Sequence, residues 1–428
     1  MTMLVFLVMI CLLVLSAPIA VALGVAIVFP SVIDLNFLTS QAYIVRSIFS
    51  GVDSTPLLAI PLFVFSGAVM AQGGISKKLF DVMAYLVGNM TGGMPCAVIL
   101  TCLFYGAISG SGPATCAAVG AMAIPVLLEL GYERTFVAAV VASASGLGII
   151  IPPSIPFILW GLGTGASVGN LFIAGIVPGI LIALVLMIYA VLYCRRTGED
   201  KERLRQNHEE LKKRGFLHVV KDGFWALLTP VIILGGIYSG IVTPTEAACI
   251  SVVYALIVSI LIYRTIRIRD IWSRVVESVM SYAPILALIA LASAFSRVLT
   301  LIGAPNMLRD MLLNNFNSKV PFLLMLNLVL LILGMLIDVG PAVVIIGPLL
   351  APIAAALGID IIHLGVVVVV NLAIGFVSPP FGLNLFVAAP QADVRVEELG
   401  KKSLPFIACF LVVLLLITFV PAISMFLM

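Results

Sequence analysis

Two interrupted apolar stretches in the first half of this chain carry residues that could do chemistry. They cover residues 106–115 and 146–154, where glycine and proline break an otherwise apolar sequence. A broken backbone inside lipid leaves polar groups unpaired, which is tolerated only where protein or a water-lined cavity satisfies them. We therefore expect a protected polar pocket within a membrane. Its candidate residues in this half are Ser109, Ser111, Thr115, Pro152 and Ser154.

The second half of the chain carries a similar pair of stretches. Asp338–Ala342 parallels Gly110–Ala114, and Phe376–Pro380 parallels Ile149–Pro153. The separation is also kept, since positions 113 and 152 lie 39 residues apart and positions 341 and 379 lie 38 apart. Interrupted apolar segments at matching positions of two halves indicate the binding site of a secondary transporter. The candidates here are Asp338, Gly340, Ser378, Pro380 and Asn384.

These residue types suit two kinds of ligand. Carbonyls freed by glycine and proline, together with hydroxyls, supply hard oxygen ligands for a small cation. Helix N-termini that face the same cavity favour an anion. The pattern therefore predicts a site for a cation and an anionic substrate. The alternative is that these residues only kink and pack helices, but their recurrence at matched spacing favours function.

Acidic residues are rare in the apolar segments. Asp338 is the one acid expected near the membrane centre, where an ionisable group is a functional hypothesis by default. It could bind a cation, titrate, or cap the backbone of the segment that follows. Glu246 follows Thr243–Thr245 at an expected helix start, which indicates a capping role.

Two arginines are expected toward the outer face of the membrane. Arg46 or Arg297 could contact an incoming anion or a docking partner. The alternative is that each anchors its helix at the interface.

The composition limits the class of protein. Of 428 residues, 62% are hydrophobic and 10% are charged, against about 25% charged in soluble domains, so we expect a polytopic membrane protein. A net charge of +3 does not indicate nucleic-acid binding.

Motifs for disulfide, metal or enzyme chemistry are not found. The seven cysteines form no CxxC pair, which predicts buried free thiols. The histidines show no metal-ligand spacing. Enzyme motifs and a phosphate-binding loop are absent, so ATP bound to this chain is not expected to drive transport. The first apolar run lacks a basic flank and is expected to be a retained helix.

The first half, residues 1–194, is predicted to contain five spans and one hairpin. Residues 93–130 are too few for two spanning helices and a turn, so they are predicted to form a re-entrant helical hairpin. A short amphipathic piece at 75–89 is expected to lie in the interface. The spans are expected near 2–15 and 18–34, with a hinge at residues 16–18, and at 54–72, 134–161 with an interruption at 152–153, and 171–193.

The second half, residues 223–428, is predicted to follow the same plan at an offset of 226–230 residues. Its hairpin is expected at 320–356, and an interfacial piece at 303–318. Its spans are expected at 224–241, 246–263, 277–302, 362–390 and 403–426. Residues 195–222, the only long polar stretch, are predicted to form a solvated cytoplasmic linker between the halves.

The orientation follows from the basic residues. An odd number of spans in each half makes the two halves an inverted repeat. If the linker is cytoplasmic, 19 of the 23 Lys and Arg residues fall inside, and only Arg46, Arg297, Arg309 and Lys319 fall outside. Both termini are then periplasmic. The two hairpins enter from opposite sides, so their tips are expected to meet near the midplane.

Several motifs together resemble the large membrane subunit of tripartite ATP-independent periplasmic (TRAP) transporters. The resemblance covers nearly the whole chain. Gly112 stands where many members have another small residue, and Ser378 stands where threonine is common. The motifs are Ala59–Phe63, Gly73–Ser76, Ile108–Ala114, Ile151–Ser154, Thr243–Ala247 and Ser378–Leu385.

This resemblance implies sodium-driven import of an organic acid across a bacterial inner membrane. A periplasmic binding protein delivers the substrate, and a small four-helix membrane subunit, either a separate chain or one removed from a fusion, pairs with the large one. The substrates include C4-dicarboxylates, sialic acid and other carboxylates, and the sequence leans toward the sialic-acid branch.

The resemblance also implies an elevator in which a transport domain, residues 93–161 and 320–390, moves against a scaffold formed by the remainder. Two sodium sites are carried over by position. Ser109, Gly112 and Pro152 would line the first, and Asp338, Ser378 and Pro380 the second. From the residues themselves we also expect Gly340 to contribute to sodium binding, and Ser111, Thr115, Ser154, Asn384 and Arg297 to contact the substrate.

Two other functions remain open from the sequence. One is a stand-alone sodium-coupled anion carrier of related fold. The other is an ion channel.

Overall fold

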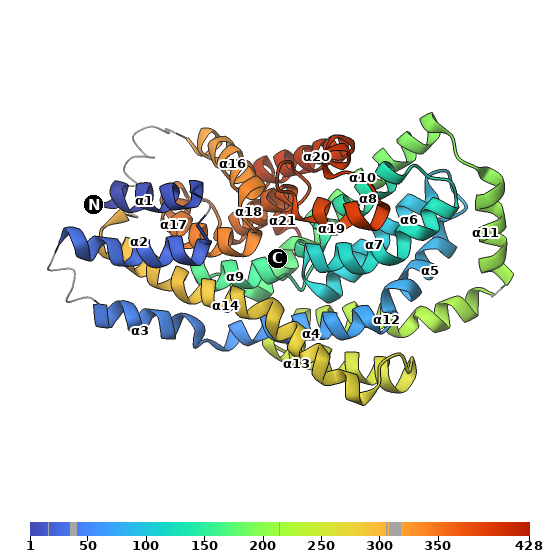
Figure 1. Ribbon diagram of the computed structural model, residues 1–428, viewed down its shortest axis with the longest axis horizontal. Helices are drawn as coiled ribbons and strands as arrows, with labels where there is room; N and C mark the ends of the chain where they lie inside the picture. Colours follow the sequence, from blue (N-terminus) through green and yellow to red (C-terminus); the bar gives the residue numbers. More distant parts are fainter. Residues whose placement is uncertain (16, 35–40, 214, 305–306, 308–317) are drawn as a thin grey trace.

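The computed structural model describes residues 1–15, 17–34, 41–213, 215–304, 307 and 318–428 (Figure 1). Every regular element in this part of the chain is a helix. By length and hydropathy, nine helices within the described ranges are able to cross a membrane. The prediction of an all-α polytopic membrane protein is therefore confirmed.

The helices of the N-terminal part lie at the predicted positions, with one addition, but within the described residues of this part only the stretch Thr55–Gln72 is long and apolar enough to span a membrane. Pro18, which has no N–H to donate, precedes the second helix, and Gly74 with φ +70° precedes the short amphipathic one. The residue at 16, part of the predicted hinge, lies outside the described residues. The helix at Gln41–Val52 was not predicted. The elements are α1 (Thr2–Val14), α2 (Ile19–Ile33), α3 (Gln41–Val52), η2 (Thr55–Leu58), α4 (Ala59–Gln72) and α5 (Ile75–Val87).

The first predicted hairpin is a pair of helices joined at Gly110, whose φ of +63° turns the chain. A broken helix and a long helix follow. One arm of the hairpin has 18 residues and is long enough to span, so helix length alone does not make it re-entrant. The elements are α6 (Gly93–Ser109), α7 (Gly112–Glu129), α8 (Arg134–Ala144), η3 (Ser145–Ile149), α9 (Ile155–Thr164) and α10 (Val168–Thr197).

The predicted linker is mostly helical and shorter than expected. Helix α10 runs into it and α12 (Phe216–Tyr238) begins within it, so only α11 (Lys201–Lys213) and two short connections remain. The predicted capping role of Glu246 is confirmed, because its backbone N–H and side chain form a capping box with Thr243. The elements are α11 (Lys201–Lys213), α12 (Phe216–Tyr238), α13 (Pro244–Leu256), η4 (Ile257–Ile262), η5 (Ile268–Asp270) and α14 (Ile271–Leu301).

The last part of the chain repeats the order of a helix pair, a broken helix and a long helix. Most of the interfacial piece predicted at 303–318, including Arg309, lies outside the described residues. The elements are α16 (Lys319–Leu336), α17 (Val339–Leu357), α18 (Ile361–Gly375), α19 (Leu383–Ala392), α20 (Val396–Phe419) and α21 (Ala422–Met425).

We divide most of the helices into two groups, and α5 packs on members of both. We call α6–α10 and α16–α20 the hairpin body, and α1–α4 with α12–α14 the frame. Helices α10 and α20 pack on each other and on α6, α8 and α18. In Figure 1, α3, α4, α13 and α14 of the frame lie along the lower side, and the N-terminus and α11 lie at opposite ends of the long axis.

A polar cluster ties α10 and α20 to the start of α8. The Glu133 carboxylate accepts hydrogen bonds from Lys402 Nζ at 2.6 Å, from the Tyr193 hydroxyl at 2.6 Å, and from Thr135. Desolvation alone would raise the pKa of Glu133, but these hydrogen bonds prevail and lower it to about 2. The cluster therefore holds three elements of the hairpin body together at one end.

Substitution of Gly375 tests the closest approach inside the hairpin body. A Cβ added at Gly375 would lie 2.1 Å from the carbonyl oxygen of Gly334, where α18 meets α16. We expect Gly375→Ala to destabilise the protein by about 1–3 kcal/mol, because the two backbones must separate. Thermal unfolding in detergent measures this. Gly235→Ala is the control, because nothing lies within 4 Å of its added Cβ; equal melting temperatures for both variants would contradict the packing argument.

Candidate functional site

The tip of the first hairpin holds a compact cluster of oxygens. Ser109 Oγ lies 2.8 Å from Thr115 Oγ1, which also donates to the Ser111 carbonyl at 2.8 Å. The side chains of Ser109 and Thr115 are buried, at 3% and 0% exposed. The structure thus brings together three of the residues that the sequence singled out, and we call them the tip cluster.

The broken helix lies directly against the tip cluster. A Cβ added at Gly148 would be 2.6 Å from Thr115 Oγ1 and 2.8 Å from the Ser111 carbonyl oxygen. On the other side of the turn, the Ile155 N–H donates to the Gly110 carbonyl at 3.4 Å. Sequence reasoning did not single out Gly148, although the glycine spacing within 146–154 was a usable signal.

Pro152 and Ser154 support the broken helix from within. Pro152 is buried, and its bond to Pro153 is cis. Ser154 is fully buried; its hydroxyl donates to the Ile149 carbonyl at 2.5 Å and accepts from the Phe157 N–H at 3.3 Å. Ser154 therefore joins the end of η3 to the start of α9.

The tip of the second hairpin is built differently. Asp338 Oδ1 accepts from the Val339 N–H at 2.9 Å, so the capping role is observed, and Asp338 lines a cavity of about 120 Å³ with Gly375 and Phe376. The hydroxyl of Ser378 is buried and donates to the Ile374 carbonyl at 2.8 Å. Pro380 is exposed, and its bond from Pro379 is cis. Asp338 and Ser378 thus have separate hydrogen-bond partners.

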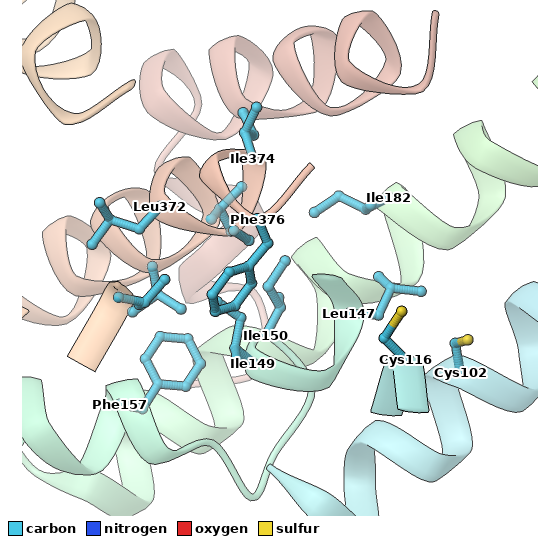
Figure 2. Close-up of a cluster of buried hydrophobic side chains, with 14 of the residues drawn as sticks. Cys102, Cys116, Leu147, Ile149, Ile150, Phe157, Ile182, Leu372, Ile374 and Phe376 are labelled. Carbon is cyan, nitrogen blue, oxygen red and sulfur yellow. The ribbon is translucent and has the colours of Figure 1, made fainter. Parts of the chain in front are cut away.

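The two halves share one core at these tips. The ring of Phe376 lies over Gly112, where an added Cβ would be 2.8 Å from the ring, and it points toward Ile149 and Ile150 in Figure 2. At the second tip, the side chain nearest to Gly340 is Leu159, 3.8 Å from the position of an added Cβ. Each hairpin tip is therefore packed against a residue from the broken helix of the other half.

Asn384 also crosses between the halves. Its Nδ2 donates to the Ala142 carbonyl at 3.0 Å, and its side chain is fully buried. Ala142 lies near the end of α8, where the helix tightens into η3. Asn384 therefore satisfies the backbone of the broken helix, while its Oδ1 has no partner in the described part of the chain.

Two of the cavities between the hairpin body and the frame have a charged residue in their described lining. The first, which we call the tip cavity, has a volume of about 560 Å³ and is lined by Ser109, Ser111, Gln72 and Glu277 among other residues from α4, α6, α7 and α14. The second, the serine cavity, has a volume of about 360 Å³ and lies between α3 and α14 on one side and α9 and α17 on the other. Its polar lining consists of Ser47, Ser50, Ser54, Ser293, Ser296, Arg297 and Thr300.

The serine lining was missed by sequence reasoning. The i, i+3 and i+4 spacing of these hydroxyls on α3 and α14 was the available signal. The structure does not bring the five predicted substrate residues to one place. Ser111 lines the tip cavity and Arg297 the serine cavity, whereas Thr115, Ser154 and Asn384 are buried.

The tip cluster can hold a small hard cation. Its ligands would be neutral hydroxyl and carbonyl oxygens from the α6–α7 turn, with the backbone of the broken helix close by. Within the described ranges, no three or more His, Cys, Asp and Glu side chains gather in a metal-binding arrangement. The chemistry of the donors therefore fits an alkali cation better than a transition metal.

Residues 6–423 match the family described as the tripartite ATP-independent periplasmic transporter, DctM component. The isethionate TRAP transporter permease protein DctMQ of Oleidesulfovibrio alaskensis is 42% identical over 97% of this chain, which spans 64% of that protein's length. The C4-dicarboxylate TRAP transporter large permease protein DctM of Pseudomonas aeruginosa is 40% identical over 86% of this chain and 85% of its own. The sialic acid TRAP transporter large permease protein SiaM of Vibrio cholerae is 31% identical over 94% of each chain.

A solved structure shares the fold. The YdaH transporter of Alcanivorax borkumensis superposes with a TM-score of 0.63, covering 91% of this chain and 90% of that one, at 16% sequence identity.

Gly148→Ala tests the tip cluster as a cation site. The added methyl group would intrude on Thr115 Oγ1 and the Ser111 carbonyl, so we expect sodium to stabilise this variant less than the parent protein. The measurement is the rise in melting temperature between potassium and sodium buffers at equal ionic strength. Gly169→Ala is the control, because its nearest neighbour is 3.8 Å away. If sodium raises the melting temperature of Gly148→Ala as much as that of the parent protein, the tip cluster is not a sodium site.

Proposed function

Because the chain belongs to the DctM-component family of tripartite ATP-independent periplasmic transporters, we propose that it carries a small organic anion inward with sodium as the coupling ion. The chain is a multi-pass membrane subunit of a solute transporter rather than an enzyme. Its family works with a periplasmic binding protein and a small membrane subunit. We propose the bacterial inner membrane as its location, with α11 on the cytoplasmic side and the N-terminus on the periplasmic side.

The tip cluster carries this proposal. Neutral oxygens at the wall of a cavity of about 560 Å³ support a cation site beside a space that admits a small organic molecule. A cation bound there adds positive charge next to the cavity, which favours an anion in it. This arrangement couples the binding of the two ions without a titratable group in the tip cluster.

The substrate class is drawn from the relatives. Those named for isethionate and for C4-dicarboxylates are more similar to this chain than the one named for sialic acid. Sulfonates and carboxylates both present delocalised negative oxygens to hydroxyls and guanidinium groups. We therefore propose a small sulfonate or carboxylate as the substrate and keep sialic acid as the alternative.

We propose that the hairpin body moves as a unit against the frame. Both cavities lie on the border between the two groups, where relative movement would open and close them. The sequence-based limits of the moving part were 93–161 and 320–390. The packing of α10 and α20 on α6, α8 and α18 supports their inclusion in that unit. The recurring order of helix pair, broken helix and long helix supports the inverted repeat.

Arg297 fits a role in the approach of the anion. It is the charged residue among the described lining of the serine cavity, where hydroxyls from α3 and α14 add hydrogen-bond donors. A guanidinium beside hydroxyls is a suitable first contact for a sulfonate or carboxylate. The alternative, an interfacial anchor, predicts that Arg297→Gln leaves uptake intact.

Reconstitution tests the function. The complex of this chain with its small subunit, placed in vesicles, should take up isethionate, succinate or sialic acid only with an inward sodium gradient and the binding protein. Uptake that persists without the binding protein and small subunit would indicate the stand-alone carrier. Flux far above carrier turnover without a sodium gradient would indicate a channel.

Asp338→Asn separates ion binding from capping. Asparagine is as good an N-cap as aspartate, so the variant removes the charge and keeps the acceptor. We expect a several-fold weaker half-saturation by sodium in vesicle uptake. Asp360→Asn is the matched control, since Asp360 caps α18 by accepting from Ile362 and His363 at 2.8 and 3.1 Å. Identical sodium dependence in both variants would leave Asp338 with the capping role alone.

A further inference from the structure

An ion pair on the frame faces the tip cavity. Glu277 lines this cavity, and its Oε2 lies 2.6 Å from Nη1 of Arg274, one turn earlier on α14. The Glu277 side chain is 54% exposed, whereas that of Arg274 is 23% exposed and does not line the cavity. The Glu277 carboxylate therefore faces the cavity, and the Arg274 guanidinium lies behind it.

No other formal charge occurs among the described residues that line the tip cavity. The remaining polar lining consists of hydroxyls and the Gln72 amide, which carry no formal charge. The potential in this cavity thus depends on Glu277, moderated by Arg274. The buried Nε of Arg274 has no hydrogen-bond partner within the described ranges, so Glu277 is the contact that orients the guanidinium.

The serine cavity has the opposite character. Arg297 is its formal charge among the described lining residues, and no acid accompanies it. Arg297 and Glu277 stand on the same helix, 20 positions apart, which corresponds to about 30 Å along the axis. One frame helix therefore contributes an acidic lining residue to the tip cavity and a basic lining residue to the serine cavity.

We propose that α14 polarises the translocation path, with Arg297 attracting anions into the serine cavity and the Arg274–Glu277 pair making the tip cavity repel anions and attract cations once sodium has left the tip cluster. This inference rests on the proposed function. The polarity favours entry of the anionic substrate at one side and release of both substrate and sodium at the other. The substrate leaves because the Glu277 carboxylate repels it. Sodium leaves the tip cluster toward that same carboxylate, which attracts it. Glu277 is a positioning charge for release and not a ligand in the tip cluster.

Charged thiol reagents measure this polarity without any transport. Ser281→Cys places a thiol in the tip cavity one turn after Glu277, and Ser296→Cys places one in the serine cavity next to Arg297. The background lacks the exposed Cys11 and Cys249 and the partly exposed Cys409. The probes are sulfonatoethyl methanethiosulfonate, an anion, and trimethylammonioethyl methanethiosulfonate, a cation. The quantity is the ratio of their reaction rates at each site at low salt.

We expect the thiol at position 281 to favour the cationic reagent and the thiol at position 296 to favour the anionic one. Removal of one charge about 6 Å away changes each rate by about threefold in water, so Glu277→Gln should shift the ratio at position 281 about tenfold toward the anionic reagent. Arg274→Gln should shift it the other way. Glu277→Asp, which keeps the charge, should leave the ratio unchanged, and added salt should reduce every shift.

Two results would overturn the proposal. One is the same reagent preference at both thiols. The other is that Glu277→Gln leaves the ratio at position 281 unchanged, although the labelling rate of the thiol in that variant shows that the cavity is intact. Because labelling needs neither substrate nor binding protein, such a failure is distinct from a failure of sodium-driven uptake.

Discussion

The structure depends on satisfying backbone groups where helices break inside an apolar body. Each break needs a partner for the carbonyls and N–H groups that the helix no longer pairs. Ser154 serves the end of η3, Ser378 the end of α18, and Asn384 the end of α8. Asp338 does so at the start of α17. The residues that look chemically active in the sequence are therefore first of all the ones that make broken helices possible.

This requirement also explains why the two halves interlock. Asn384 reaches the Ala142 carbonyl across 242 positions of sequence, and Phe376 packs on Gly112 of the first hairpin. Glycine at 112, 148 and 375 lets backbone approach backbone, ring or hydroxyl at distances that a Cβ would prevent. The hairpin body is consequently one packed unit, in which each tip contacts the broken helix of the other half.

The frame contributes charge and hydroxyls instead of broken backbone. Helix α14 is a long continuous helix that lines both cavities, with Arg297 in one and Glu277 in the other. Neutral oxygens lie on the hairpin body, and the formal charges that face the two cavities lie on the frame. In the proposed mechanism, this division lets the body carry its cargo past fixed charges while its own ion site stays uncharged when empty.

The sequence by itself determined the helical membrane class, the positions of most helices, the helix pairs at 93–130 and 320–356, and the positions of the backbone breaks. Glycine, proline and apolar periodicity act locally, so these features can be read from neighbouring residues. Helix α3, the serine cavity and the role of Gly148 were missed, and Ser111 and Arg297 proved to line different cavities. Those facts depend on which helices meet in space. Contacts such as Gly148 against Thr115, or Asn384 against Ala142, arise from the packing of distant segments, which only the tertiary structure decides.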